Sequence, residues 1–374
     1  MLLLLKLHLV NLLYKVQIRH YLSKTNQKLS QVEYKTLFDS LDKCFIEWFV
    51  GFVDAEGCFQ VRVRDRREKN RGLTVELSFL IHLHKDDLPL LTLIQKTLGC
   101  GNIRRSGKEF VLFEVTRRGE IFGLIIPIFE SFPLNSVKYL DYLAFKKVAE
   151  LILHNKHNSP EGLKTITTLQ NTMNSQRIEY DLPSNHSIRI TLPWLIGFTE
   201  GDGSFTTNKN YPVLSWTLSS REFNLLKAIR EFLGGQGHIS TIKTQILSQK
   251  DKSYLIISKI DLLFNTILPL FNSHGLYSVK AIDFFWWSNI VKLNYFGYHK
   301  LNEGLALIEK IKGQINLSRR NSESLLDTNP SSSSLYKEVR QLLTEPAPYI
   351  IKEGNRLNVK TGRLVSSTSL SKKE

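Results

Sequence analysis

The chain contains an internal repeat, and a repeat constrains the possible folds more than any other feature of this sequence. Three short segments recur in the same order along the chain. They are WFVGFVDAEGCF (48–59) and WLIGFTEGDGSF (194–205), SVKYLDY (136–142) and SVKAIDF (278–284), and EGL (161–163) and EGL (303–305). Because the order is kept, the sequence predicts two copies of one folding unit.

Each copy shows the same succession of helical and strand patterns. In the first copy, Asp39 or Ser40 is expected to cap a helix that runs to about Glu56 and stops at Gly57. Strand-like alternation follows, interrupted by an extra stretch at 65–72 of the kind that loops absorb. The predicted fold class is therefore α+β, with two pseudo-symmetric αββαββα repeats.

The repeat also divides the chain into expected regions. Both ends differ from the middle, because the first 32 residues contain no acid and the last part is rich in serine and asparagine. The expected regions are a basic leader or fused extension (1–40), the first repeat (41–154), a linker with a short helix (155–190), the second repeat (191–317) and a polar, loosely ordered tail (318–374) with one short helix near 335–343.

Both repeated helices end in a carboxylate. Small residues four apart clear a stripe on which two helix backbones could pack, namely Gly51 and Ala55 in the first and Gly197 and Gly201 in the second. That packing would place Glu56 and Asp202 side by side at helix C-termini, where the dipoles and the two charges repel. One such acid would be an ordinary solvated helix end. Its recurrence in both copies indicates a bound divalent cation.

Residues 49–57 (FVGFVDAEG) and 195–203 (LIGFTEGDG) resemble two copies of the LAGLIDADG motif. Over about residues 41–317 the chain resembles the single-chain, double-motif LAGLIDADG homing endonucleases of organellar introns. The resemblance implies a monomer whose two sheets form a saddle over double-stranded DNA, with the motif helices at its centre. It also implies a metal-dependent double-strand break with short 3′ overhangs, which promotes intron homing.

The resemblance gives roles to matching positions. The last acid of each motif would bind Mg²⁺ together with the preceding backbone carbonyl, the earlier acid would be structural, and a lysine after the fourth strand would act near the cleavage centre. In that order the pairs are Glu56 and Asp202, Ala55 and Gly201, Asp54 and Glu200, and Lys138 and Lys280. Read without the resemblance, the two lysines are charges on a helix surface.

DNA recognition is expected from polar side chains that alternate with core residues along the strands, since a sheet in the major groove can read base edges. Each half would cover about one helical turn, which gives a target of about 20 base pairs. The first copy offers Gln60, Arg62, Arg64, Thr74, Glu76, Ser78, His82 and Arg104, with Arg66 in a loop that resembles a phosphate clamp. The second copy offers Ser204, Thr206, Asn208, Ser215, Thr217 and Ser219.

The overall charge agrees with a nucleic-acid partner, because 50 Lys and Arg against 35 Asp and Glu give a formal charge of +15. Three distant cysteines exclude a disulfide scaffold, and the apolar stretch 1–13 is shorter than a membrane span. The sequence shows neither a G-x-G-x-x-G fingerprint nor a Walker loop. Family habit and the leader favour a mitochondrion, with a chloroplast as the alternative.

Two other functions fit the same resemblance. An RNA maturase that assists splicing of its host group I intron needs a basic surface and could act with or without DNA cleavage. A DNA-binding regulator derived from the fold would be expected to have lost the motif acids, and both are present here.

Overall fold

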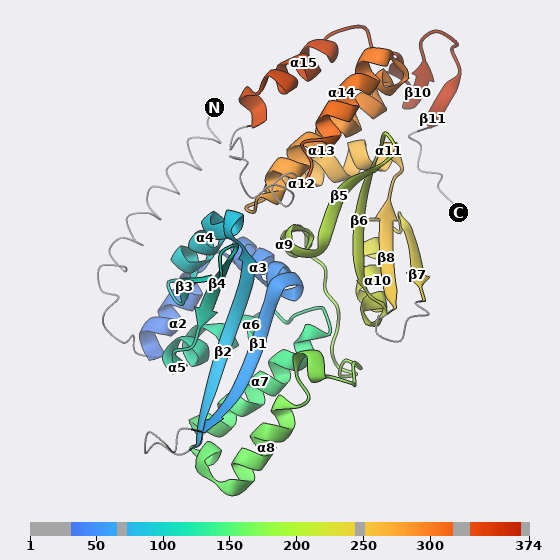
Figure 1. The fold of residues 1–374 in the computed structure, drawn as a ribbon. Coiled ribbons are helices and arrows are strands. Elements are labelled where there is room, and N and C mark those ends of the chain that lie inside the picture. Colours follow the sequence, from blue (N-terminus) through green and yellow to red (C-terminus); the bar gives the residue numbers. More distant parts are fainter. Residues whose placement is uncertain (1–30, 66–72, 244–250, 317–329, 368–374) are drawn as a thin grey trace. The chain divides into compact units, whose positions relative to one another are not determined.

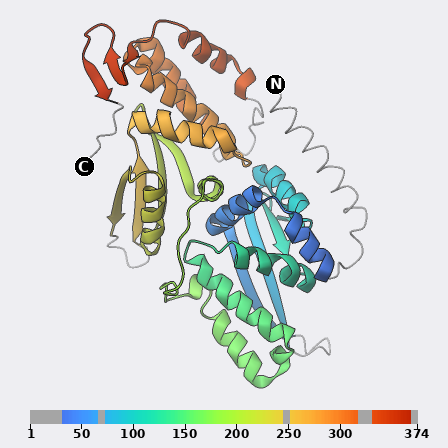
Figure 2. The same cartoon turned by 180° about the vertical axis from the view of Figure 1, so that it is seen from behind.

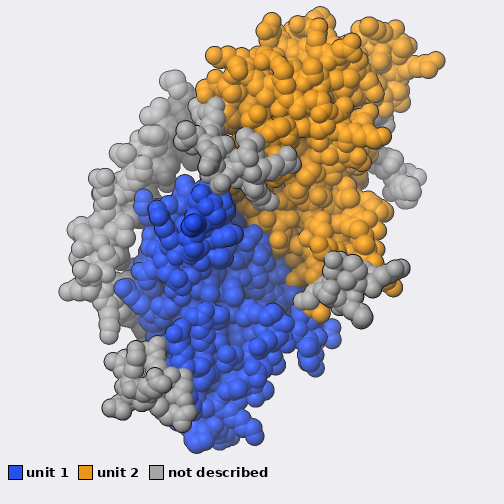
Figure 3. All heavy atoms as spheres, in the orientation of Figure 1, with its two compact units in different colours: residues 1–187 blue, residues 188–374 orange. Residues whose placement is uncertain are grey.

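The computed structural model divides the chain into two compact units, residues 1–187 and 188–374 (Figure 3). The described residues are 31–65, 73–243, 251–316 and 330–367. Arg66 and residues 1–30 of the expected leader lie outside them. The two units are described separately below.

Unit 1 contains one four-stranded sheet and its helices (Figure 1). Its helices are α2 (Gln31–Ser40), α3 (Lys43–Glu56), α4 (Leu88–Leu98), α5 (Arg118–Glu120), the π-helix η3 (Ile121–Ile125), α6 (Ile126–Ser131), α7 (Lys138–Leu153) and α8 (Pro160–Gln170), with short 3₁₀ turns at Lys85–Asp87, Lys156–Asn158 and Asn174–Gln176. Its strands are β1 (Gly57–Asp65), β2 (Leu73–His84), β3 (Asn102–Ser106) and β4 (Phe110–Val115).

Unit 2 repeats this order and adds a C-terminal segment (Figure 1). Its helices are α9 (Leu192–Asp202), α10 (Phe223–Phe232), α11 (Ile260–Leu262), the π-helix η7 (Leu263–Ile267), α12 (Leu268–His274), α13 (Lys280–Tyr295), α14 (Asn302–Lys312) and α15 (Ser334–Leu342), with 3₁₀ turns at Ser220–Glu222, Tyr298–Lys300 and Pro330–Ser332. Its strands are β5 (Gly203–Asn208), β6 (Tyr211–Ser219), β7 (His238–Ile242), β8 (Lys252–Ile257), β9 (Tyr349–Lys352), β10 (Asn355–Asn358) and β11 (Leu364–Ser367).

The two main sheets have the same topology. The strand orders are β1-β2-β4-β3 and β5-β6-β8-β7, and every neighbouring pair is antiparallel. In each unit a motif helix leads directly into the first strand, and a long helix follows the fourth. The predicted α+β class and the two αββαββα repeats are therefore confirmed.

One face of each sheet is covered by helices, and an aromatic cluster fills the space between them. In unit 1 the Phe59 ring lies 5.2 Å from Phe129 of α6 and 5.4 Å from Phe145 of α7. In unit 2 the matching Phe205 lies 5.1 Å from Trp287 of α13. Figure 2 shows α6 and α7 lying over the sheet of unit 1. Burial of each such ring stabilises the unit by about 2–3 kcal/mol. The opposite face of each sheet is not covered by these helices, and we call it the open face.

The helix expected from Asp39 or Ser40 to Glu56 is α3, but it begins later, at Lys43, and a separate helix, α2, precedes it within the expected leader. The carboxylate of Asp42 accepts a hydrogen bond of 2.8 Å from the backbone N–H of Phe45, so Asp42 caps α3. Helix α2 packs on unit 1 through Tyr34, which is 7% exposed. A Cβ on Gly123 would lie 2.6 Å from this side chain, so a glycine is needed beneath the ring.

The last part of the chain was expected to be loosely ordered with one short helix. That helix is present as α15, but residues 349–367 also form a three-stranded antiparallel sheet, β11-β10-β9, that the sequence did not suggest. Val339 and Tyr349 are buried, and Arg356 is only 4% exposed. We call residues 330–367 the C-terminal module.

No helix in the described parts of the chain has the length and apolar character that crossing a bilayer requires.

Candidate active site

The carboxylates of Glu56 and Asp202 lie where the two motif helices end. The chain passes from α3 directly into β1 at Gly57 and from α9 directly into β5 at Gly203. A Cβ on Gly57 would lie 2.4 Å from Cγ1 of Val53, and one on Gly203 would lie 2.3 Å from Cγ2 of Thr199. Glycine is therefore required at both junctions, because any side chain would push the strand away from the helix that bears the acid.

The earlier acid of each motif binds the turn that leads into the long helix of its own unit. The Asp54 carboxylate accepts hydrogen bonds from the backbone N–H groups of Asn135 (2.8 Å) and Ser136 (2.9 Å), just before α7. The Glu200 carboxylate accepts them from Tyr277 (2.7 Å) and Ser278 (2.6 Å), just before α13. Both acids are buried, at 4% and 5% exposure. This geometry supports the structural role expected for them.

The lysine at the start of each long helix binds the C-terminal end of the motif helix in the same unit. The Lys138 ammonium donates to the backbone carbonyls of Val53 (2.9 Å) and Ala55 (3.0 Å). The Lys280 ammonium donates to the carbonyls of Thr199, Gly201 and Gly203, at 3.1, 3.0 and 2.5 Å. These are carbonyls at a helix C-terminus, where a positive charge is favoured.

Each unit therefore contains two reciprocal contacts between the motif helix and the long helix, which we call the cross-brace. It consists of Asp54 with Lys138 in unit 1 and of Glu200 with Lys280 in unit 2. The acid of the motif helix holds the start of the long helix, and the lysine of the long helix holds the end of the motif helix. The cross-brace fixes the backbone from which Glu56 or Asp202 projects.

The carbonyls expected to bind metal also belong to the cross-brace. The oxygens of Ala55 and Gly201 accept from the lysines, although a carbonyl has two lone pairs and can accept a second partner. Among the described residues, no cluster of three or more His, Cys, Asp or Glu could hold a metal ion. A divalent cation prefers about six oxygen ligands, so the donors within one half suit it only if phosphate or water supplies the rest.

A third set of contacts joins the long helix to the segment that follows it. The Asp141 carboxylate accepts from the Arg177 guanidinium at 2.8 Å and from the backbone N–H of Asn174 at 3.0 Å. The Asp283 carboxylate accepts from the backbone N–H of Asn316 at 2.7 Å. Sequence reasoning missed these residues, although the spacing from Asp141 to Asn174 recurs from Asp283 to Asn316.

Two titratable groups near the unit 1 cross-brace have shifted pKa values. Burial raises the pKa of the Cys58 thiol, against the opposing positive charge of Lys138. Burial also lowers the pKa of His186, whose ring stacks 4.3 Å from Tyr139, against the opposing charge of Asp54. Desolvation thus dominates here and keeps both groups neutral near neutral pH.

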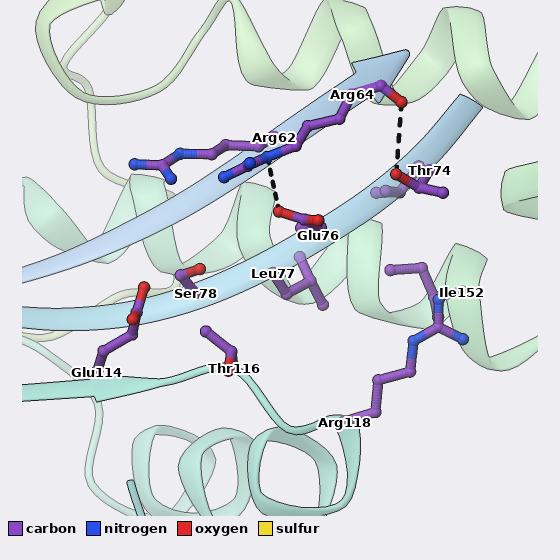
Figure 4. Close-up of a pocket in the computed structure, with 11 residues that line it drawn as sticks. Arg62, Arg64, Thr74, Glu76, Leu77, Ser78, Glu114, Thr116, Arg118 and Ile152 are labelled. Atoms are coloured by element: carbon purple, nitrogen blue, oxygen red, sulfur yellow. Dashed lines mark hydrogen bonds and ion pairs between the residues drawn. The ribbon is translucent and has the colours of Figure 1, made fainter. Parts of the chain in front are cut away.

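The open sheet face of unit 1 carries the predicted DNA-binding residues together. The strand register pairs Gln60 with Ser78, Arg62 with Glu76 and Arg64 with Thr74. An ion pair of 2.8 Å joins the Arg64 guanidinium to the Glu76 carboxylate. All of these residues except Gln60 line a groove of about 450 Å³ (Figure 4). Ser78 is only 5% exposed, so it offers little surface to a ligand.

Farther along the same face, sequence reasoning missed three contributors. Phe110 is 46% exposed and stacks on the predicted His82 at 5.1 Å between ring centres. Glu114 forms an ion pair of 3.3 Å with the predicted Arg104, and Arg118 lines the groove. The alternation in β4 contained this signal, because Phe110, Leu112 and Glu114 occupy the positions opposite β2 residues of the open face.

The open face of unit 2 is less charged. The register pairs Ser204 with Ser215, Thr217 with Tyr254, and Ser219 with Lys252. Asn208 and Thr206 follow Ser204 along β5, and they lie opposite Tyr211 and Val213. Sequence reasoning missed Tyr211 on this face, which is 49% exposed.

The chain matches a known protein family along both repeats. The family model described as LAGLIDADG endonuclease matches residues 49–149 and 195–291. The chain is 31% identical to the "Probable intron-encoded endonuclease Cox1-I1b" of Schizosaccharomyces pombe over 72% of this chain and 70% of that protein. It is 26% identical to the "Uncharacterized mitochondrial protein RF1" of Saccharomyces cerevisiae over 76% of this chain, and the match spans 62% of that longer protein.

The fold also matches solved structures. The structure of "I-SmaMI bound to uncleaved DNA target in the presence of Calcium ions" matches with a TM-score of 0.65 and 28% sequence identity. That match covers 72% of this chain and 98% of the other.

Proposed function

Because the chain belongs to the LAGLIDADG endonuclease family, we propose that it is a site-specific DNA endonuclease of intron homing. It would make a double-strand break with short 3′ overhangs at a target of about 20 base pairs. The observation that carries the proposal is the cross-brace, which recurs in both units and holds the helix end that bears Glu56 or Asp202. A protein that only binds DNA has no need for two braced carboxylates.

The proposal places Glu56 and Asp202 at one cleavage centre, as the family resemblance implies. With oxygens of the scissile phosphates, and with the Ala55 and Gly201 carbonyls, they would hold divalent cations, for which we propose Mg²⁺. When bound, such an ion supplies Lewis-acid stabilisation of the phosphate and of the leaving oxygen. The calcium ions of the related DNA complex support a divalent cation in this family.

Lys138 and Lys280 complete the proposed catalytic set. Their ammonium groups hold the peptide carbonyls next to the two acids, so they orient the carboxylates. In the same position they would add positive potential near a phosphate held by those carboxylates. We propose this second role for both lysines.

The open sheet faces would read the target. In the major groove, Arg62 and Arg64 suit guanine, Gln60 and Asn208 suit adenine, and the hydroxyl side chains are more permissive. Thr74, Glu76, Ser78, His82 and Arg104 complete the proposed surface of unit 1, and Ser204, Thr206, Ser215, Thr217 and Ser219 that of unit 2. Arg66, outside the described residues, would contact phosphate.

We further propose that the protein acts as a monomer on double-stranded DNA in a mitochondrion. Two complete repeats in one chain give both halves of the pseudo-symmetric unit without a second subunit. Similarity to a mitochondrial protein of Saccharomyces cerevisiae supports the location, whereas these relatives give no support to a chloroplast. The maturase role on host intron RNA stays an alternative that the basic charge alone would serve.

The test is cleavage of a plasmid library that carries randomised or intron-flank targets, incubated with Mg²⁺ or with Ca²⁺ and sequenced at the new ends. The proposal predicts paired ends at one long motif with Mg²⁺ and binding without cleavage in Ca²⁺. Specific binding without any cut in Mg²⁺, under conditions where a known family enzyme cleaves, would refute it. Splicing of the host intron RNA would then be the next assay.

A further inference from the structure

The hairpins at the start of the two main sheets differ in their turns. In unit 1 the strands β1 and β2 are joined by residues 66–72, with the sequence RREKNRG, which contains four basic residues and one acid. In unit 2 the strands β5 and β6 are joined by Lys209 and Asn210 alone. Unit 2 therefore lacks the basic loop that unit 1 has at this place.

The C-terminal module docks beside the short turn of unit 2. The Tyr211 ring lies 5.6 Å from His299, and the His299 ring lies 6.0 Å from Tyr349 of the module. The Asn294 side chain of α13 donates to the carbonyl of Asn210 at 3.0 Å. Figures 1 and 2 both show the β9–β11 sheet at the β5–β6 end of unit 2.

Several close contacts hold the C-terminal module against the rest of unit 2. Arg356 is 4% exposed, donates to the carbonyl of Tyr295 at 3.1 Å and lies 3.6 Å from the Asp261 carboxylate. The backbone N–H of Tyr349 donates to the carbonyl of Phe296 at 2.9 Å. Gly297, with φ of +89°, allows the close approach, because a Cβ there would lie 2.7 Å from Cγ of Tyr349. A side chain of the module is thus held at a fixed place.

The module presents positive charge at the end that meets the hairpin. Tyr349 pairs with Asn358, where the chain turns from β10 toward β11. The Asn358 side chain accepts from the N–H of Thr361 at 3.0 Å and so fixes this turn. The turn carries Lys360 and Arg363, both exposed.

Two further exposed lysines are next to the residues that make these docking contacts. Lys209 is in the hairpin turn before Tyr211, and Lys300 follows His299. We call Lys209, Lys300, Lys360 and Arg363 the tip patch. Glu309 is close to Asn210, and its carboxylate is paired with Lys312 at 2.7 Å.

We propose that the tip patch binds backbone phosphates of duplex DNA beyond the outer end of the second half of the target. The proposal rests on the proposed endonuclease function. The C-terminal module would supply to unit 2 the kind of phosphate contact that we propose for Arg66 in unit 1. Such contacts raise affinity and fix register without reading sequence, which suits charged side chains at a turn outside the open sheet face.

The experiment measures DNA affinity against salt concentration for the full chain and for the double variant K360Q/R363Q. Losing two phosphate contacts should make the slope of log affinity against log salt shallower by about 2, and lower the affinity roughly 10- to 30-fold near 0.15 M salt. The difference should vanish on a target whose flank beyond the second half is cut back to the last recognised base pair. The matched control is K337Q/R340Q, which removes the same charge from exposed positions on α15.

A long duplex of unrelated sequence separates this proposal from the proposed function. If the wild type cleaves no target, the endonuclease proposal fails, but a shallower slope for K360Q/R363Q than for the control on that duplex still supports the patch. Equal slopes for the two variants overturn the proposal. If the slopes are equal, an oligomer that becomes monomeric in I350S/L364S would identify the module as a protein-docking face.

Discussion

The two units use the same cross-brace at different depths. Lys280 is 4% exposed and donates to three carbonyls, whereas Lys138 is half-buried and donates to two. An ammonium buried in this way is tolerated because carbonyl oxygens replace its water. The difference shows that one repeat can hold its motif helix with a more enclosed lysine than the other, so the two halves should respond differently to the same substitution.

The open faces also differ. In unit 1 charged side chains dominate, and Arg64 is fixed by Glu76. In unit 2 hydroxyl and aromatic side chains dominate, and the positive charge lies at the tip patch instead. Because arginine gives stronger base discrimination than a hydroxyl group, we expect the first half to contribute more of the specificity.

The largest expected effect is on stability, when the cross-brace lysines are replaced by methionine. Lys280→Met leaves buried carbonyls without a donor and should lower the free energy of unfolding by roughly 3 kcal/mol, whereas Lys138→Met should cost about 1 kcal/mol. Urea denaturation of both variants measures the two costs. Equal losses would contradict the inference that the two cross-braces differ in depth.

The next effect concerns recognition. Arg62→Ala should relax specificity at one base pair of the first half by about 1–3 kcal/mol, whereas Thr217→Ala in the second half should cost under about 1 kcal/mol. Competition binding against a panel of single-base variants of the target measures both. A larger loss for Thr217→Ala would reverse the proposed division of labour between the faces.

The smallest effect is a pH dependence of the docking of the C-terminal module in unit 2. Burial, together with the positive charge of Lys300, lowers the pKa of His299 to about 4 from its usual 6.5. The unfolded chain therefore takes up a proton first as the pH falls, so docking of the C-terminal module should weaken progressively below pH 6.5. No such loss is expected above pH 6.5, where His299 is neutral in both states.

Hydrogen exchange in β9 and β10, followed from pH 7.5 to 5.5, measures this weakening. The variant H299F keeps an aromatic ring between Tyr211 and Tyr349 but cannot be protonated. Its exchange protection should lose the added dependence on pH. A pH response that is the same in the wild type and in H299F would exclude His299 as its source.

Much of the fold could be predicted because the repeat supplied each pattern twice. The end of α3 at Gly57, the end of α4 at Gly99 and the Thr191 cap of α9 all follow from local chemistry that a short window contains. The start of α3 was predicted too early because Asp39, Ser40 and Asp42 are all good caps, and only packing selects among them.

Long-range contacts were harder to predict. The β9–β11 sheet depends on the burial of Arg356 against Asp261 and Tyr295, and its four-residue strands are too short to show an apolar alternation that would reveal it. Only part of the cross-brace could be predicted from the sequence. The lysines were identified by resemblance, but their acceptors are backbone carbonyls, which carry no sequence signal. Contacts that depend on the type of side chain could be predicted, whereas contacts made to backbone groups could not.

The most direct test of the account is single-turnover cleavage of the target in Mg²⁺, resolved by strand, for Glu56→Gln and Asp202→Asn. Both variants keep the cross-brace, so their unfolding midpoints and their footprint on the target DNA should match those of the wild type. The account predicts that each variant loses double-strand cleavage by roughly 10²–10³-fold or more. Wild-type double-strand cleavage by either variant would contradict it.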